Sequence, residues 1–224
     1  MGAEGFEQAA FSGTGLACRR GGRTVFAELA FRLESGGALV LRGANGSGKT
    51  TLLRLMAGLS VPTAGQLAWN GADALDDPDA HGARTRFVGH LDGLKPSMTA
   101  AENLAFAAQL WGDEKAARVN AALEAFGLGR LAELPVRVLS AGQRHRLALA
   151  RLLVVPAPLW LLDEPGNALD DDSLHALARV VAEHRNRGGM IVVAAHGAAP
   201  VTDGATLDVT RFAAVIPPHW SDAA

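Results

Sequence analysis

Apolar residues along the chain gather in short continuous runs, separated by longer segments that carry apolar residues at helical spacing. The run 39–41 is followed by a glycine-rich stretch at 43–48 and then by 50–57, where leucine and methionine recur three and four residues apart. Gly58 follows directly, as glycine often does after the last turn of a helix. This order predicts a buried strand, a turn-forming loop and a helix.

The remaining pattern predicts an α/β fold with several consecutive helices in its middle. Helices are expected at 99–111, 114–126, 140–154 and 171–187. Short apolar runs predict strands at 66–69, 86–89, 158–163 and 190–195, with a further candidate at 206–210. Because three helices lie between strands, we expect one domain over 1–224, with a helical subdomain at about 95–155 inserted in an α/β core.

The glycine-rich stretch and the start of the next helix fit the pattern G-x-x-x-x-G-K-S/T. Its residues, with the threonine that follows, are Gly43, Ala44, Asn45, Gly46, Ser47, Gly48, Lys49, Thr50 and Thr51. Glycines let successive backbone N–H groups turn inward around phosphates, and the helix N-terminus adds its dipole. We expect Lys49 to reach the terminal phosphates of ATP and the Thr50 hydroxyl to ligate Mg²⁺. A chance glycine-rich turn would not explain the strand before it and the helix after it.

An acidic pair, Asp163 and Glu164, ends the apolar run at 158–163. Parallel strands deliver ligands at their carboxyl ends, the edge at which the phosphate loop is also expected. We expect Asp163 to hold Mg²⁺ through water and Glu164 to polarise the attacking water. An acidic pair alone is more often a solvated turn, but here a phosphate loop precedes it in the chain.

The composition of the chain argues against several classes of protein: nucleic-acid-binding, disulfide-rich and membrane-spanning ones. The 224 residues are 49% apolar with a formal net charge of −2, so we expect a good-sized core and no nucleic-acid partner. The single cysteine, Cys18, excludes a disulfide framework within the chain. The first 15 residues lack the basic end and apolar stretch of a signal peptide, and arginine and proline interrupt the apolar run 147–162. We therefore expect a soluble chain, with any membrane crossing left to another subunit.

The segment 139–143 reads Leu-Ser-Ala-Gly-Gln and precedes a helix. Ser140 alone would be taken for a helix N-cap. The segment resembles, however, the signature motif of the ABC ATPase family, LSGGQ, with one alanine for glycine. Residues 167–170 resemble the D-loop of that family. His196, which follows the run 190–195, matches its catalytic switch histidine. The chain is therefore similar to ABC ATPases over nearly its whole length.

The resemblance implies a P-loop, RecA-like core with an inserted helical subdomain and a small N-terminal β part. It also implies ATP hydrolysis by a head-to-tail homodimer, in which each ATP is held by the P-loop of one copy and the signature of the other. Ser140 and the amides around Gly142, at the start of a helix, would form that second phosphate-binding end. A single copy would then carry half of each active site.

Two positions depart from the family pattern. The glutamine of the family's Q-loop is expected 13 residues before Asn103, where this chain has His90. Imidazole is a poorer Mg²⁺ ligand than an amide oxygen, so we expect His90 to hydrogen-bond near the nucleotide rather than to ligate the ion. The aromatic residue that stacks on adenine is expected near Arg20, whose guanidinium plane could stack in its place.

Within the ABC ATPases, the segments 86–90, 93–95 and 98–104 resemble the ATP-binding subunits of bacterial haem exporters of cytochrome c maturation. That resemblance implies integral membrane subunits as partners and a peripheral position on the cytoplasmic face of the bacterial inner membrane. Hydrolysis would then drive haem handling, such as release of a haem-loaded chaperone, without haem binding to this chain.

Three other interpretations stay open. The chain could be the ATPase of another small exporter, a soluble ABC protein acting on ribosomes or DNA, or a P-loop kinase. Soluble ABC proteins usually carry tandem ATPase domains, long coiled coils or basic extensions, and the sequence contains none of these. A kinase would leave the signature motif unexplained.

Overall fold

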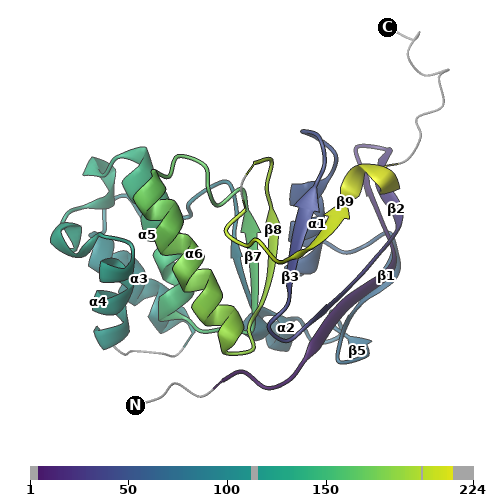
Figure 1. Ribbon diagram of the computed structural model, residues 1–224, viewed down its shortest axis with the longest axis horizontal. Helices are drawn as coiled ribbons and strands as arrows, with labels where there is room; N and C mark the ends of the chain where they lie inside the picture. Colours follow the sequence, from purple (N-terminus) through teal and green to yellow (C-terminus); the bar gives the residue numbers. More distant parts are fainter. Residues whose placement is uncertain (1–4, 112–115, 198, 214–224) are drawn as a thin grey trace, which may run out of the picture.

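The computed structural model describes residues 5–111, 116–197 and 199–213, which form two β-sheets surrounded by helices (Figure 1). The parallel sheet has the strand order β6-β7-β8-β3-β9. Its strands are β3 (Ala38–Arg42), β6 (Thr85–Val88), β7 (Leu159–Asp163), β8 (Met190–Ala194) and β9 (Ala205–Asp208). The segments that follow β3, β8 and β7 therefore leave the sheet side by side at its carboxyl edge.

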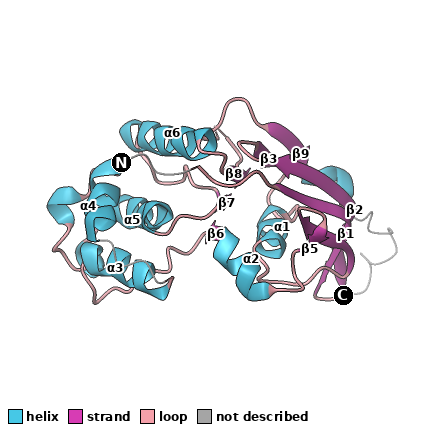
Figure 2. Ribbon diagram, turned by 90° about the horizontal axis from the view of Figure 1, so that it is seen from below, coloured by secondary structure: helices cyan, strands magenta, loops and turns pink. Residues whose placement is uncertain are grey.

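Six α-helices lie within the described residues: α1 (Lys49–Met56), α2 (Pro78–Arg84), α3 (Ala100–Leu110), α4 (Ala116–Ala125), α5 (Ala141–Val154) and α6 (Asp171–Asn186). Helices α3, α4 and α5 gather on the side away from the antiparallel sheet (Figure 2). Short 3₁₀ turns lie at Gly129–Leu131, Val136–Val138 and Val209–Phe212. In the described ranges, none of the helices combines the length and apolarity that a membrane crossing requires.

The apolar core has two parts, one on each face of the parallel sheet. Every residue of β7 and β8 is buried, as continuous apolar runs in a parallel sheet are. Trp160 and Leu162 of β7 belong to the core shared with α3 to α6, whereas Leu159 and Leu161 belong to the core around α1. The sheet is therefore held between two apolar layers, which fixes the positions of its strand ends.

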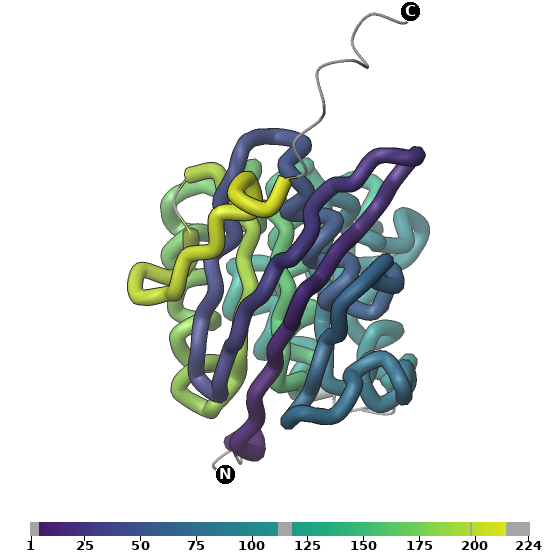
Figure 3. The backbone as a smooth tube through the Cα atoms, turned by 90° about the vertical axis from the view of Figure 1, so that its right-hand side faces the viewer, coloured from purple at the N-terminus to yellow at the C-terminus, as the bar shows by residue number. Residues whose placement is uncertain are grey.

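The antiparallel sheet is larger than the small N-terminal β part that was expected. Its order is β2-β1-β4-β5. The strands are β1 (Ala10–Arg20), β2 (Arg23–Glu34), β4 (Ala64–Trp69) and β5 (Ala72–Asp73). The long β1 and β2 run antiparallel across the face nearest the viewer in Figure 3. This sheet closes over α1 and the loop that precedes it.

The helices expected in the middle of the chain are present, and the α/β fold class is confirmed. Residues 114 and 115, where the second of them was expected to begin, lie outside the described residues. A capping box begins α3, because Thr99 and Glu102 each accept a hydrogen bond from the other's backbone N–H. The strand expected at 206–210 ends at Asp208, where a 3₁₀ turn begins. The bounds of a helical subdomain remain a prediction.

Candidate nucleotide site

The phosphate-loop segment joins the end of β3 to the start of α1, as its sequence predicts. Gly48 has a φ of 103° and begins α1 without a side-chain cap. A Cβ on Gly48 would lie 2.6 Å from a methyl group of Val25, and one on Gly43 would lie 2.6 Å from Ser47 Oγ. Glycine is therefore required at both positions for the loop to curl this tightly.

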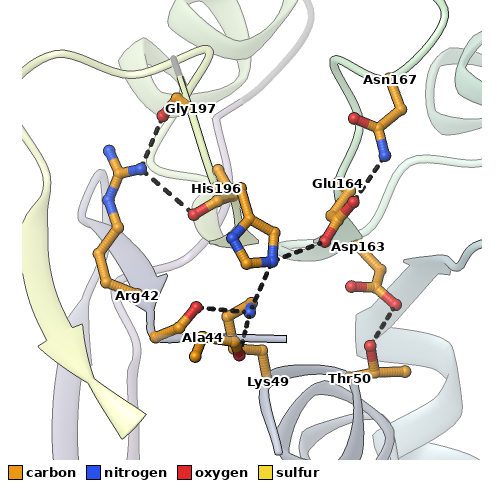
Figure 4. Close-up of polar contacts among 11 residues, drawn as sticks. Arg42, Ala44, Lys49, Thr50, Asp163, Glu164, Asn167, His196 and Gly197 are labelled. Carbon is orange, nitrogen blue, oxygen red and sulfur yellow. Dashed lines mark hydrogen bonds and ion pairs between the residues drawn. The ribbon is translucent and has the colours of Figure 1, made fainter. Parts of the chain in front are cut away.

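The ammonium group of Lys49 lies at the centre of this loop. Its Nζ donates hydrogen bonds to the carbonyl oxygens of Gly43 at 2.8 Å and Ala44 at 3.0 Å. His196 Nε2, on the segment after β8, lies 3.0 Å from the same Nζ (Figure 4). Lys49 is only 6% exposed, so its positive charge is held close to the loop rather than in solvent.

Asp163 and Thr50 meet at the end of β7. Thr50 Oγ1 donates to Asp163 Oδ2 at 2.8 Å. Burial raises the pKa of Asp163 the most, and the charge of Glu164 adds to this. The Thr50 hydrogen bond and the charges of His90 and Lys49 oppose the rise. The described residues contain no cluster of three or more acidic, histidine or cysteine side chains that could hold a metal ion. A hard cation at this oxygen pair would therefore need further oxygens from nucleotide and water, as Mg²⁺ sites commonly do.

Glu164 lies directly after β7 and faces the segment that carries His196. Its Oε1 is 3.4 Å from His196 Nε2, and its Oε2 accepts a hydrogen bond of 2.6 Å from Asn167 Nδ2 (Figure 4). Glu164 has a positive φ of 51°, which is uncommon for a residue with a side chain. The local backbone conformation and the hydrogen bond from Asn167 thus orient the Glu164 carboxylate towards His196.

A cavity of about 310 Å³ opens beside the loop. All of its lining residues except Val25 are residues that the sequence predicts to contact nucleotide or to act on it. Its lining consists of Arg20, Val25, Asn45, Gly46, Gly48, Lys49, Thr50, Thr51 and Glu164. Arg20, the candidate for the adenine position, comes from the end of β1 and is exposed. The antiparallel sheet therefore supplies one wall of the cavity.

A second cavity, of about 280 Å³, lies on the other side of Thr50 and Asp163. His90 lines it, together with the rest of the segment 87–93 and with Arg54, Ala148 and Arg151. His90 is exposed at the rim of this hollow. The family's Q-loop position therefore lies next to the Thr50 and Asp163 oxygens, as the sequence predicts.

The two predicted residues of the signature segment are not brought to the nucleotide cavity within one copy of the chain. Ser140 caps α5, forming a reciprocal capping box with Gln143, and Gly142 lies in the first turn. Neither residue is among the described residues that line the cavity. A Cβ on Gly142 would lie 2.9 Å from the carbonyl oxygen of Ala168, so the signature packs against the D-loop segment.

Three residues at this edge of the sheet were given no role by the sequence. Asn167 holds Glu164, although only its place in a D-loop-like segment pointed to it. Arg42, the last residue of β3, donates to the carbonyl oxygens of Ala195 and Gly197. His145 of α5 lies 3.2 Å from Asp92 Oδ1 and 3.1 Å from the carbonyl oxygen of Pro165. These contacts join segments far apart in the chain, which no local motif reveals.

Comparison with known proteins identifies the family and the fold. The family model described as ABC transporter matches residues 26–167. A solved structure titled "Structure of ATP binding subunit of ABC transporter" has a TM-score of 0.77 at 25% identity, covering 83% of this chain and 79% of that one. A putative ABC transporter ATP-binding protein from Pyrococcus furiosus has a TM-score of 0.80 at 22% identity, covering 92% of this chain and 100% of that one, and supports the fold alone. Fold and site thus define an ABC-type ATPase.

Two relatives narrow this class further. The cytochrome c biogenesis ATP-binding export protein CcmA of Paramagnetospirillum magneticum is 54% identical, over 91% of this chain and 95% of its own length. The protein of the same name from Rhodospirillum rubrum is 51% identical, over 92% and 88%. The chain belongs to the ABC transporter family and, within it, to the CcmA family of ATP-binding proteins. It is an ATP-hydrolysing enzyme, as predicted.

Proposed function

We propose that this chain is the ATP-binding and hydrolysing subunit of a bacterial haem exporter, a membrane complex of cytochrome c maturation. Relatives that match 91% and 92% of the chain are named cytochrome c biogenesis ATP-binding export proteins. The proposal of ATP hydrolysis rests on one observation, that three side chains meet at one edge of the parallel sheet. His196 Nε2 lies 3.0 Å from Lys49 Nζ and 3.4 Å from Glu164 Oε1.

In the proposed reaction, Lys49 supplies the positive charge for the β- and γ-phosphates of ATP. The phosphate oxygens would replace the loop carbonyls as partners of its Nζ. Glu164 polarises the water that attacks the γ-phosphorus and takes up its proton, while the bond to the bridging oxygen breaks and ADP leaves. Asn167 keeps the Glu164 carboxylate pointed, since it already donates to the other carboxylate oxygen.

Thr50 and Asp163 are proposed to hold Mg²⁺ with the nucleotide. The donors fit, because a hydroxyl and a carboxylate oxygen lie 2.8 Å apart and a hard cation prefers oxygen. When bound, the ion would neutralise charge on the phosphate oxygens. A neighbouring cation would also favour the charged form of Asp163, whose pKa burial raises.

The base of the nucleotide is proposed to rest beside Arg20. This residue lines the same cavity as the phosphate loop and is exposed, so its guanidinium plane is free to stack on a ring. The weaker hold of a guanidinium compared with an aromatic ring would leave most of the binding to the phosphates.

The active unit is proposed to be a head-to-tail homodimer. The start of α5, with Ser140 exposed, is absent from the lining of the nucleotide cavity within the described part of one copy. A helix start with free N–H groups is a phosphate-binding end, so a second copy can present Ser140 and Gly142 to the γ-phosphate. Such a dimer would close two nucleotide sites at once.

The segment 90–97 is proposed to face the integral membrane subunits, on the cytoplasmic side of the inner membrane. Leu91 is 84% exposed, which is unusual for a large apolar side chain. The segment is nonetheless firmly held: Arg151 donates to the Asp92 carbonyl at 3.1 Å, and Asn103 Oδ1 accepts from Lys95 N at 2.8 Å. An exposed apolar side chain on a well-held segment beside the nucleotide site could link partner binding to ATP hydrolysis.

The test is to purify the tagged full chain from detergent-solubilised membranes of its own bacterium, identify the bound proteins and measure the product of ATP turnover. We expect integral membrane subunits of cytochrome c maturation and free phosphate. Co-purification with ribosomes or DNA would contradict the proposal, as would phosphate transfer to an acceptor. A Lys49→Ala chain should bring down the same membrane subunits, because Lys49 lies away from the proposed docking segment.

A further inference from the structure

Arg42 reaches from the last position of β3 to the segment that carries His196. Its Nη1 donates to the carbonyl oxygen of Ala195 at 3.2 Å and to that of Gly197 at 2.6 Å (Figure 4). These carbonyls belong to the residues on either side of His196. One guanidinium nitrogen therefore fixes the backbone before and after this histidine.

Within the described residues, the hydrogen bonds of the parallel sheet stop just before His196. Strand β8 ends at Ala194, and the last sheet contact is the hydrogen bond from Ala195 N to the Leu41 carbonyl, at 3.3 Å. A Cβ built on Gly197 would meet no atom within 4 Å, so the space on that side of the Gly197 backbone is open. The hydrogen bonds from Arg42 begin at Ala195, where those of the sheet end, and they hold the backbone as far as Gly197.

Arg42 is also connected to the phosphate loop through its place in the chain. Its two hydrogen bonds to the carbonyls on either side of His196 are called the Arg42 clamp below. Arg42 directly precedes Gly43, the first residue of the phosphate loop and a partner of Lys49 Nζ. The same short segment thus shapes the loop through its backbone and the histidine segment through the Arg42 side chain. Charge-assisted hydrogen bonds of this kind are stronger than neutral ones and are specific in direction.

We propose that Arg42 is a positioning residue for ATP hydrolysis, which holds His196 Nε2 between Lys49 and Glu164. The assignment rests on the proposed catalytic role of His196. Without the clamp, the histidine segment would sample other positions, and correct geometry would be reached in a smaller fraction of molecules. Nucleotide binding, which depends on the phosphate loop, would change little.

The experiment is a double-mutant cycle on the purified full chain, with kcat and KM for ATP measured by phosphate release. Arg42→Ala should lower kcat about tenfold and leave KM within about twofold. In a His196→Ala background, Arg42→Ala should not lower kcat further, because the imidazole that Arg42 positions is absent. Arg42→Lys keeps the charge on a side chain one atom shorter and should restore part of kcat.

The outcomes separate the failure of this inference from that of the proposed function. If His196→Ala turns over ATP like the parent, the catalytic role of the histidine is wrong. If His196→Ala is slow but Arg42→Ala is not, or if Arg42→Ala costs the same factor in both backgrounds, only the positioning role is overturned. Arg32→Ala, which removes an exposed arginine on β2, is the matched control and should keep the parent kcat. Thermal unfolding checks that each variant is folded, and Arg42→Gln replaces Arg42→Ala in the cycle if the latter does not fold.

Discussion

At the scale of single residues, Nε2 of His196 lies between a hydrogen-bond donor, Lys49, and a hydrogen-bond acceptor, Glu164. Lys49 Nζ can only donate a hydrogen bond and the Glu164 carboxylate can only accept one, yet both lie near His196 Nε2. A single nitrogen cannot serve both at the same time. When phosphate draws the Lys49 ammonium away, Nε2 becomes free to donate to Glu164 or to the transferred phosphate. We therefore expect nucleotide binding to change the hydrogen bonds of His196 and Glu164, the two proposed catalytic groups.

Lys49→Ala should weaken ATP binding by about tenfold or more, because it removes the only charge held inside the phosphate loop. Titration with a fluorescent ATP analogue measures the affinity, and phosphate release measures turnover. Lys95→Ala removes an exposed lysine outside the cavity and is the control, with parent-like affinity expected. Equal affinity and turnover for Lys49→Ala and the parent would contradict the assignment.

His184 is a buried histidine that makes stability depend on pH. It is 5% exposed, is stacked on Trp160 at 3.7 Å and has Nε2 3.2 Å from the Met190 carbonyl oxygen. Burial lowers the pKa of His184 from 6.5 to about 4. Between these values the unfolded chain binds more protons than the folded one, so this stability is complete above pH 6.5 and is lost as the pH falls towards 4.

Going from pH 7 to pH 5 should therefore cost the parent about 2 kcal/mol more stability than it costs His184→Gln, which cannot take up this proton. Urea unfolding at the two pH values measures the difference. His175→Gln, an exposed histidine on the same helix, should keep the pH dependence of the parent. An identical pH dependence in His184→Gln and the parent would show that His184 is not the titrating group.

At the scale of elements, α3 and α5 hold the segment 90–97 in place. Asn103 of α3 accepts from Lys95 N and donates to the Lys95 and Thr99 carbonyls, and α5 contributes Arg151. His145 of α5 contacts both Asp92 and the Pro165 carbonyl, next to Glu164. Helix α5 therefore contacts both the proposed docking segment and the residue after Glu164, the proposed general base, so it is the element through which we expect a partner to act on the site.

Leu91→Asp should reduce co-purification of the membrane subunits severalfold, because it places a charge on the proposed apolar contact. Nucleotide affinity should not change. Val61→Asp makes the same change at a residue that is 79% exposed elsewhere, and it should leave assembly intact. Equal recovery of membrane subunits with both variants would argue against this docking segment. Leu94 is a poorer choice, since it packs on the core.

Elements whose sequence pattern is regular could be predicted, and those with interrupted patterns could not. The phosphate loop was recognisable because its motif stands between an apolar run and a helical repeat. Strand β2 was not assigned because Glu28, with a φ of 54°, inserts an extra residue into the ladder. Phe26 and Leu29 therefore share the buried face despite their odd spacing. Helix α2 has only seven residues and few apolar ones.

The same limit applies to the candidate site. Motif spacing places Lys49, Asp163 and Glu164 near one another because parallel strands end at a common edge. Arg42 and Ala195, however, are 153 residues apart and belong to no shared motif, so their contact needed the structure. Sequence reasoning finds groups that a motif carries, and it misses groups whose role arises only from long-range packing.

At the scale of the whole molecule, one copy of the chain leaves its nucleotide site open. The phosphate loop, Asp163 and Glu164 follow strands of the parallel sheet, whereas Ser140 caps α5, which lies among the helices away from the antiparallel sheet (Figure 2). Within the described residues, nothing from the signature segment lines the nucleotide cavity. A second copy in head-to-tail orientation would complete both sites.

Glu164→Gln should bind ATP normally, hydrolyse it at least about a hundredfold more slowly and accumulate as an ATP-bound dimer. The amide keeps the shape of the carboxylate but loses the charge that polarises water. Size-exclusion chromatography with MgATP measures the dimer. Adding Lys49→Ala to the same chain should return it to monomer. If the Glu164→Gln chain stays monomeric with ATP and with membrane subunits supplied, the head-to-tail arrangement is wrong.

The central claim is that ATP hydrolysis by this chain drives cytochrome c maturation. The most direct measurement is the amount of covalently bound haem in c-type cytochromes of the bacterium that carries it, after deletion of the gene and restoration with parent or variant chains. The account predicts that deletion abolishes haem attachment, that the parent chain restores it, and that Lys49→Ala and Glu164→Gln do not. Normal haem attachment in the deletion strain, or full restoration by either variant, would contradict it.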